Sequence, residues 1–244
     1  MNISILMLQY LSLSNLSYDP ELVIEPFHRG RKLSTPFKFI PDQFDWRDSG
    51  LVSPVREQGG CNACWAFSAA GSIEYHFRQK IKDAEVDVQN IIDCTQYTYG
   101  CKGGLMEHVF EYKKAFPLKY DFKHKKKKCY PHAKGAHVND FMAIEQDIEY
   151  SLPYMVQKWG PVTVGIDFTK QHGYKGGVIQ ADDCGKDPHH AVLVVGYTKN
   201  FWVIKNSMGT LWGDGGYAYV ERGKNACGID STYAAVATDV SIIY

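Results

Sequence analysis

The spacing of apolar positions follows a helical period in the first half of the chain. It covers Cys64 to about Gln79, and shorter stretches over Asp87–Cys94 and Leu105–Phe116. This period predicts helices, because it gathers the apolar side chains on one helical face. Asp87 is suited to cap the second helix, and Pro117 to end the third. A short further helix is expected over Tyr154–Trp159, with Pro153 in its first turn.

The second half carries short runs rich in β-branched and aromatic residues, separated by Gly, Asn and Asp. These runs predict strands over Val162–Ile166, Ala191–Val195, Phe201–Ile204 and Tyr217–Val220. A helical half followed by a strand half indicates an α+β protein with two lobes. A cleft between such lobes is a usual place for an active site.

Composition narrows the class of protein. The 244 residues include 45% hydrophobic and 14% aromatic residues, enough for a packed core. The 27 Lys and Arg residues balance 27 Asp and Glu residues, which argues against nucleic acid as the main partner. No stretch approaches the roughly 20 apolar residues that span a bilayer, so no membrane span is predicted.

Residues 1–40 differ from the rest of the chain. They contain prolines and a basic patch but no clear periodicity, so we interpret them as an N-terminal extension, and the folded body is expected over 41–244. The apolar start, Ile3–Leu13, lacks a positive flank and is a poor secretory signal. Two interpretations of residues 1–40 stay open: a signal or pro-region remnant, and a structural segment.

The lysine run at 123–128 is interpreted as a solvated loop, with a polyanion-docking patch as the alternative.

Seven cysteines indicate an oxidising compartment, and the odd number leaves one thiol after pairing. Cys61 and Cys64 form a C-x-x-C pair, which also occurs in redox and zinc sites. No second C-x-x-C or spaced histidine pair completes a zinc site, so neither a metal nor a cofactor is expected.

The residues around Cys64 suit thiol chemistry. Cys64 begins the first predicted helix, where free N–H groups and the helix dipole favour a thiolate. A neighbouring imidazole, from His189 or His190, would lower the thiol pKa further. Asn206, after a predicted strand, can orient such a ring through its amide oxygen. Gln58 can add an N–H donor for a developing oxyanion.

At this point the sequence resembles the papain family of cysteine proteases, in its cathepsin L-like branch. The resemblance covers about residues 41–238. It rests on the ordered motifs DWRDSGLVSPVREQGGCNACWAFSAAGSIE, IIDCTQYTYGCKGGLMEHVF, WGPVTVGID, HHAVLVVGY, FWVIKNSMGTLWGDGGY and CGID. The separations 190 − 64 = 126 and 206 − 64 = 142 lie near the roughly 130–150 residues typical of the family.

The resemblance implies a fold and a set of catalytic roles. The fold is papain-like, with a helical lobe over about 41–137 and a β-barrel-like lobe over about 138–244. Cys64 is implied as the nucleophile, His190 as the acid and base, Asn206 as its orienting residue, and Gln58 as an oxyanion donor beside the Cys64 N–H. The implied disulfides are Cys61–Cys101, Cys94–Cys129 and Cys184–Cys227.

The resemblance also implies an endopeptidase acting on proteins or peptides. The residues implied to bind substrate are Gly103, Gly104, Leu105, Met106, Gly165, His189, Thr232 and Trp212. Their mostly small or apolar character predicts a bulky hydrophobic residue at the second non-primed position, and the lack of an acid at 232 argues against Arg. A monomer, inhibitors of cystatin type, and a lysosomal or secreted location are further expectations.

The sequence departs from the family pattern at several positions. Met208 stands where the family has a Trp that covers the Asn–His hydrogen bond, which predicts a weaker Asn206–His190 contact and lowered turnover. Asn62 stands where Gly is usual, and we expect it to narrow the cleft beside Cys64. The family's long inhibitory pro-segment has no match in the first 40 residues. These departures leave an alternative, a papain-fold binding protein with little or no activity; an exopeptidase would need a blocking loop that we do not find.

Overall fold

The structure is a computed structural model that describes residues 40–118, 123, 125, 127–145, 148–231 and 233–244. The predicted N-terminal extension therefore lies outside the described residues, except for residue 40, and so does part of the lysine run. The helices are α2 (Cys64–Arg78), α3 (Val88–Cys94), α4 (Met106–Phe110) and α5 (Ile148–Trp159). Short 3-10 helices are η1 (Trp46–Ser49), η2 (Gly100–Lys102), η3 (Ala181–Asp183) and η4 (Ala226–Gly228).

Three predicted helices begin at or next to the expected residues, and the Asp87 cap is confirmed. The Asp87 carboxylate accepts a hydrogen bond of 3.0 Å from the Asn90 N–H, in the first turn of α3. Such a bond satisfies one of the donors that a helix start leaves free. The longest helix, α2, starts at Cys64 itself.

The prediction of a helix over Leu105–Phe116 is wrong at its C-terminal end, because α4 stops at Phe110. The backbone of Phe116 instead pairs with Ala136, with hydrogen bonds of 2.7 Å in both directions. Those N–H and C=O groups are then no longer available to a helix. The apolar residues after Phe110 keep a helical spacing although the chain is no longer helical there. They are apolar because they face the core from an extended segment.

The helix predicted over Tyr154–Trp159 is longer than expected, since α5 begins at Ile148 and Pro153 lies inside it. A proline inside a helix removes one backbone hydrogen bond and is normally costly. Ile148, Leu152 and Val156 are buried in the core of the sheet. Tertiary packing of this face outweighs the cost of the proline.

The strands form one mixed sheet. They are β1 (Phe44–Asp45), β2 (Gly135–Ile144), β3 (Val162–Ile166), β4 (Val178–Ile179), β5 (His190–Tyr197), β6 (Phe201–Lys205), β7 (Tyr217–Glu221) and β8 (Ala234–Ile243). Their order is β2-β8-β3-β5-β6-β7-β4, with β1 paired to β5. All pairs are antiparallel except β4 with β7.

The expected α+β class is confirmed, but the expected closed, barrel-like lobe is not. The end strands β2 and β4 do not pair with each other in the described part of the chain. The physical reason lies at both ends: β4 has only two residues, whereas β2 turns toward the helices and buries Ala136 and Val138 among them. The sheet therefore stays open.

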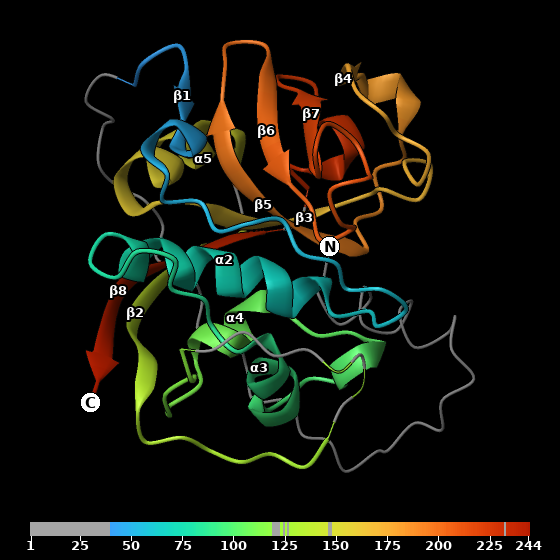
Figure 1. Cartoon of the computed structure of the whole chain (residues 1–244). Coiled ribbons are helices and arrows are strands. Elements are labelled where there is room, and N and C mark those ends of the chain that lie inside the picture. The colour runs from blue at the N-terminus through green and yellow to red at the C-terminus, as the bar shows by residue number, and fades with distance from the viewer. Residues whose placement is uncertain (1–39, 119–122, 124, 126, 146–147, 232) are drawn as a thin grey trace.

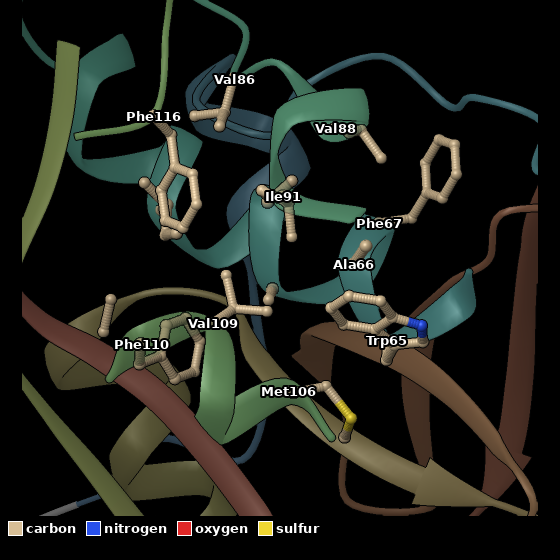
Figure 2. Packing of buried hydrophobic residues seen from close by; sticks show 14 of the residues in the cluster. Trp65, Ala66, Phe67, Val86, Val88, Ile91, Met106, Val109, Phe110 and Phe116 are labelled. Carbon is tan, nitrogen blue, oxygen red and sulfur yellow. The ribbon is translucent and has the colours of Figure 1, made fainter. Parts of the chain in front are cut away.

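The buried hydrophobic residues form two large cores, of which the first contains α2, and a smaller cluster of Leu193, Val195 and Val203. Figure 1 shows α2 between strands β3, β5 and β6 on one side and helices α3 and α4 on the other. Figure 2 shows the helical core, in which Trp65 and Phe67 of α2 pack with Ile91 of α3 and with Val109 and Phe110 of α4. The second core lies between α5 and the sheet.

Strand β8 contributes to both cores, because its successive side chains point alternately into one core and the other. Ala235 and Ala237 are buried in the helical core, whereas Ala234 and Val236 are buried in the sheet core. Successive side chains of a strand point to opposite faces, so one strand can close both cores. The N-terminal segment joins the sheet core, since β1 pairs with β5 and Phe44 and Trp46 pack against that core. The division of the chain at about residues 137 and 138 stays a prediction.

Close packing of α2 on β5 brings the two halves of the site together. The Ser68 hydroxyl of α2 donates a hydrogen bond of 2.9 Å to the Val192 carbonyl of β5. At Gly71 an added Cβ would lie 2.6 Å from the end of the Leu193 side chain, so any larger residue would force Leu193 to shift. Cys64 is the first residue of α2 and His190 the first of β5.

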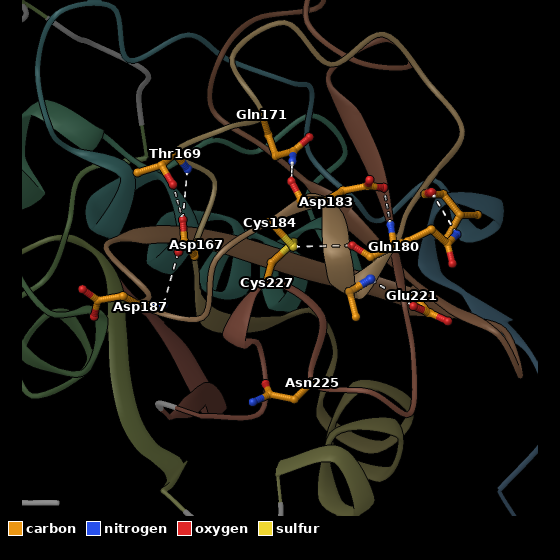
Figure 3. The surroundings of a disulfide bond; sticks show 12 residues. Asp167, Thr169, Gln171, Gln180, Asp183, Cys184, Asp187, Glu221, Asn225 and Cys227 are labelled. Carbon is orange, nitrogen blue, oxygen red and sulfur yellow. Dashed lines mark hydrogen bonds between the residues drawn. A yellow bond between two sulfur atoms is a disulfide. The ribbon is translucent and has the colours of Figure 1, made fainter.

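Three disulfides connect the same pairs that the resemblance implies, namely Cys61–Cys101, Cys94–Cys129 and Cys184–Cys227. The last, shown in Figure 3, joins η4 to the segment that leads into β5. Cys64 has no disulfide partner and is buried. The one cysteine that forms no disulfide is therefore Cys64, at the start of α2.

Candidate active site

The Cys64 thiol lies at the N-terminus of a fifteen-residue helix and hydrogen-bonds to the His190 side chain. Burial raises the pKa of this thiol. The charge of His190 and hydrogen bonds from His190 and the backbone lower it by more, so the pKa falls below its ordinary value. For His190, burial lowers the pKa, while the Cys64 sulfur and Asn206 raise it by more. These opposite shifts favour a thiolate–imidazolium pair.

Asn206, directly after β6, holds the other side of the imidazole. The His190 Nε2 lies 2.8 Å from Asn206 Oδ1, and the same oxygen accepts 2.8 Å from the Ser207 N–H. An amide oxygen only accepts, so Nε2 must carry a proton. The other ring nitrogen, Nδ1, is then the one that serves the Cys64 sulfur.

Two residues near this arrangement, Met208 and Asn62, depart from the family pattern. The His190–Asn206 bond has the length of an ordinary hydrogen bond, and the weaker contact expected from Met208 stays a prediction. Met208 is half-buried and packs against the sheet core. Asn62 is exposed, and its φ is not positive, so the local backbone does not require glycine.

Gln58 is fixed beside the loop that carries Asn206. Its Nε2 donates 3.0 Å to the Cys61 carbonyl, and its Oε1 accepts 2.6 Å from the Ser207 hydroxyl. The Gln58 N–H donates 2.8 Å to the Ser207 carbonyl. Both loops are therefore joined next to Cys64, and the amide cannot rotate freely.

A family comparison covers the whole of this site. The sequence matches the family described as papain family cysteine protease over residues 40–237. The chain belongs to the papain family.

Relatives and solved structures agree with this assignment. The chain is 38% identical to "Thiol protease aleurain-like" of Arabidopsis thaliana, covering 81% of this chain but only 61% of that protein. It is similar to digestive procathepsin L2 of Tenebrio molitor (TM-score 0.76, 33% identity, 85% of this chain and 70% of that one). It is also similar to a Carica candamarcensis cysteine protease solved with E-64 (TM-score 0.76, 30% identity, 82% and 99%).

A buried cluster of charges lies next to Asn206. Arg56 and Glu74 form an ion pair of 2.9 Å, and the Lys205 ammonium donates 2.9 Å to the Ser53 hydroxyl. Burial, with the charge of Arg56, lowers the pKa of Lys205 to about 7. Arg56, Lys205 and Asn206 line a cavity of about 20 Å³, which has room for one water molecule.

The residues expected to bind substrate fall into two groups. Gly103–Met106 run beside α2, where an added Cβ at Gly104 would lie 2.8 Å from the Trp65 ring. Gly165 of β3 pairs with Ala191, the neighbour of His190. His189 lies 3.8 Å from the Asp167 carboxylate, and its ring contacts the Asp187 carbonyl. Thr232 lies outside the described residues.

Trp212 is buried, with its indole N–H donating 2.9 Å to the Gln171 carbonyl. The Phe168 ring contacts both residues, with centroid distances of 5.9 Å to Trp212 and 6.1 Å to His190. Sequence reasoning did not single out Phe168. The only available signal was a large apolar residue just after β3, which is indistinguishable from an ordinary core residue.

Tyr233 is a second residue that the sequence did not single out. Its hydroxyl accepts 3.1 Å from the Met106 N–H and lies 3.3 Å from the Met106 sulfur. Burial and the nearby Glu107 raise the pKa of Tyr233 well above its usual value. The phenol therefore stays neutral and fixes the start of α4, where the predicted substrate pocket lies.

Neither a membrane-crossing helix nor a metal site appears in the described part of the chain. No helix there is long and apolar enough to cross a bilayer. No group of three or more His, Cys, Asp or Glu residues among those described is placed to hold a metal ion.

Proposed function

We propose that this chain is a cysteine endopeptidase that cleaves peptide bonds through a thioester intermediate. The observation that carries the proposal is the Cys64–His190 contact. The free cysteine stands at a helix N-terminus, its pKa is lowered by His190, and Asn206 holds that imidazole from the far side. Such an arrangement supplies a nucleophile and a proton donor in one contact.

Acylation uses each of these groups in turn. The Cys64 thiolate attacks the substrate carbonyl carbon, a C–S bond forms, and the carbonyl electron pair moves onto oxygen. Gln58 Nε2 and the Cys64 N–H stabilise that oxyanion. The C–N bond then breaks, and His190 gives its proton to the leaving amine.

Deacylation reverses the role of the imidazole. Neutral His190 takes a proton from water, the resulting hydroxide attacks the thioester, and the C–S bond breaks. The acid product leaves, and the thiolate–imidazolium pair is restored. Asn206 keeps the ring in place through both steps, because its bond to Nε2 does not depend on which species faces Nδ1.

The expected pocket favours a hydrophobic residue at the second non-primed position. Met106 is almost fully buried, while Leu105, Gly165 and His189 are half-buried around the start of α4 and the end of β3. Apart from His189, this lining presents apolar surface or no side chain at all. A substrate residue such as Leu or Phe gains most from burial there.

Location, oligomeric state and inhibition belong to the same proposal. Three disulfides fit a lysosomal or secreted protein. Burial raises the pKa of Glu107 to about 8 and of Asp230 to about 7, which suits an acidic compartment. We expect a monomer by sedimentation, and inhibition by proteins of cystatin type in an activity assay.

An inactive binding protein is the second candidate, and Met208 and Asn62 are the observations that favour it. One experiment separates the two. A vinyl-sulfone or epoxide thiol reagent should label the chain stoichiometrically, and Cys64→Ser should abolish the label. The protein should also hydrolyse a fluorogenic dipeptide carrying Leu or Phe at about pH 5 to 7. Labelling without hydrolysis would contradict the endopeptidase and support the binding protein.

A further inference from the structure

We propose that Phe168 is a positioning residue for His190. Its ring covers one face of the imidazole and shields the His190–Asn206 bond from water, a task that a Trp performs in the family and that Met208 cannot fully perform here. The proposal rests on the proposed function, in which the orientation of His190 decides the rate.

The first observation is the geometry of the two rings. The Phe168 and His190 centroids are 6.1 Å apart, with an interplanar angle of 28°, so the rings are stacked. Phe168 is only 2% exposed. In the β3–β5 pairing Ile166 lies opposite His190, and Phe168 comes two residues later in the chain. The strand register itself therefore brings this side chain to the imidazole.

The second observation is that the ring is supported from behind. Trp212 lies 5.9 Å from Phe168, and Tyr174 lies 5.3 Å from Trp212. The Trp212 indole is fixed by its bond to the Gln171 carbonyl. Four aromatic rings thus follow one another from Tyr174 to His190, which leaves the Phe168 ring little freedom to move away.

The backbone at Phe168 is held equally firmly. The preceding Asp167 N–H donates 2.7 Å to the Cys227 carbonyl, and the Asp167 carboxylate accepts from the Thr169 and Asp187 N–H groups. Figure 3 shows Asp167 between Thr169 and Asp187, beside the Cys184–Cys227 disulfide. The segment on which Phe168 sits is thus fixed to the segment that leads to His190.

An aromatic face has two effects on a neighbouring imidazole. It attracts the charged imidazolium through its π electrons, and it excludes water that would compete for the Nε2 proton. Met208 packs in the same core as Phe168 and Trp212, but a thioether is narrower and more flexible than an indole. The aromatic cover therefore comes from the end of β3 rather than from the loop after Asn206.

The charged and hydrogen-bonding groups around His190 are separate from this ring contact. Cys64 faces the imidazole from α2, and the neutral Asn206 amide faces it from the end of β6. At the end of β3, Asp167 lies near His189 rather than His190. Replacing Phe168 by a residue without an aromatic ring leaves all of these groups in place, so a change in the Cys64–His190 ion pair would result from the loss of the ring.

The test compares Phe168→Leu and Phe168→Met with wild type and with Phe141→Leu. The control removes a ring contact of 5.8 Å with Phe110 in the other core. Two readouts are used: the pH profile of Cys64 alkylation by iodoacetamide, and kcat and KM separately. In both Phe168 variants we expect the rate of Cys64 alkylation at about pH 6 to fall about five-fold. We expect kcat to fall by about the same factor, and KM to change less than about two-fold. Phe141→Leu should leave both unchanged.

Rescue makes the test specific. Met208→Trp should recover most of the loss when combined with Phe168→Leu, and its effect on kcat should be larger there than in the wild type. Unchanged alkylation and kcat in either folded Phe168 variant, or no recovery by Met208→Trp, would overturn the inference while the proposed function stands. If the pH profile of Cys64 alkylation in the wild type is that of an ordinary thiol, the proposed function is overturned, and this inference with it.

Discussion

The amide of Gln58 illustrates how much one side chain contributes at the residue scale. It is held between the Cys61 carbonyl and the Ser207 hydroxyl, so its N–H group has a fixed direction. We predict that Gln58→Ala lowers kcat about 10²-fold, because an oxyanion donor acts mainly in the transition state. KM should change only a few-fold, as measured by steady-state hydrolysis of the Leu or Phe dipeptide substrate. Gln180→Ala, at an exposed glutamine, is the control; an equal loss in both variants would contradict the role.

The sequence predicted the reactive residues far better than their supporting residues. Cys64, His190 and Asn206 belong to recognisable motifs, because their chemistry requires particular residue types, and the structure brings all three together. Phe168 acts through its shape and burial, and Tyr233 through burial and a hydroxyl that meets Met106. Many apolar residues share those properties, so their contribution becomes visible only when their neighbours are known.

At the scale of elements, α2 is stabilised by a charge pair that is cut off from water. Glu74 of α2 is fully buried and accepts both from Arg56 and from the Val86 N–H. We predict that Glu74→Gln lowers the free energy of unfolding by about 3–5 kcal/mol, because it leaves the Arg56 cation buried without its carboxylate. Urea unfolding followed by tryptophan fluorescence measures this. Glu57→Gln, at an exposed residue, should cost less than about 0.5 kcal/mol; equal values would contradict the account.

Elements were predictable where their pattern was local. The start of α2, the cap of α3 and strand β3 follow from short stretches of sequence. Strands β2 and β8 were not predicted, although they pair over most of their length. Each of these strands buries side chains in one core from one face and in the other core from the opposite face. Neither strand therefore shows a simple alternation of apolar and polar residues. The early end of α4 depends on the distant pairing of Phe116 with Ala136, which no local pattern encodes.

For the molecule as a whole, buried acids set the dependence of stability on pH. Burial, with the charges of Glu111 and Glu145, raises the pKa of Glu107 from 4.5 to about 8. Between these values the unfolded chain has lost a proton that the folded protein keeps, so stability falls as the pH rises. We predict a lower melting temperature at pH 8 than at pH 5, and a smaller difference in Glu107→Gln.

Asp230 adds to the same trend. Burial and the neighbouring Glu149 raise its pKa to about 7, so Asp230→Asn should also reduce the loss of stability at high pH. Thermal unfolding at both pH values measures the effect, with Asp42→Asn as an exposed control. A melting temperature that is equal or higher at pH 8 in wild type would contradict this prediction.

The most direct test of the central claim is the pH dependence of Cys64 alkylation by iodoacetamide, followed by mass spectrometry in wild type and in His190→Ala. If His190 keeps the sulfur ionised, wild type should react rapidly well below pH 8, where an ordinary thiol is mostly protonated. In His190→Ala the reaction should begin only near or above pH 9, because burial then raises the thiol pKa and only the weaker backbone hydrogen bonds oppose it. Identical profiles that rise only near pH 8.5 to 9 in both proteins would contradict the account.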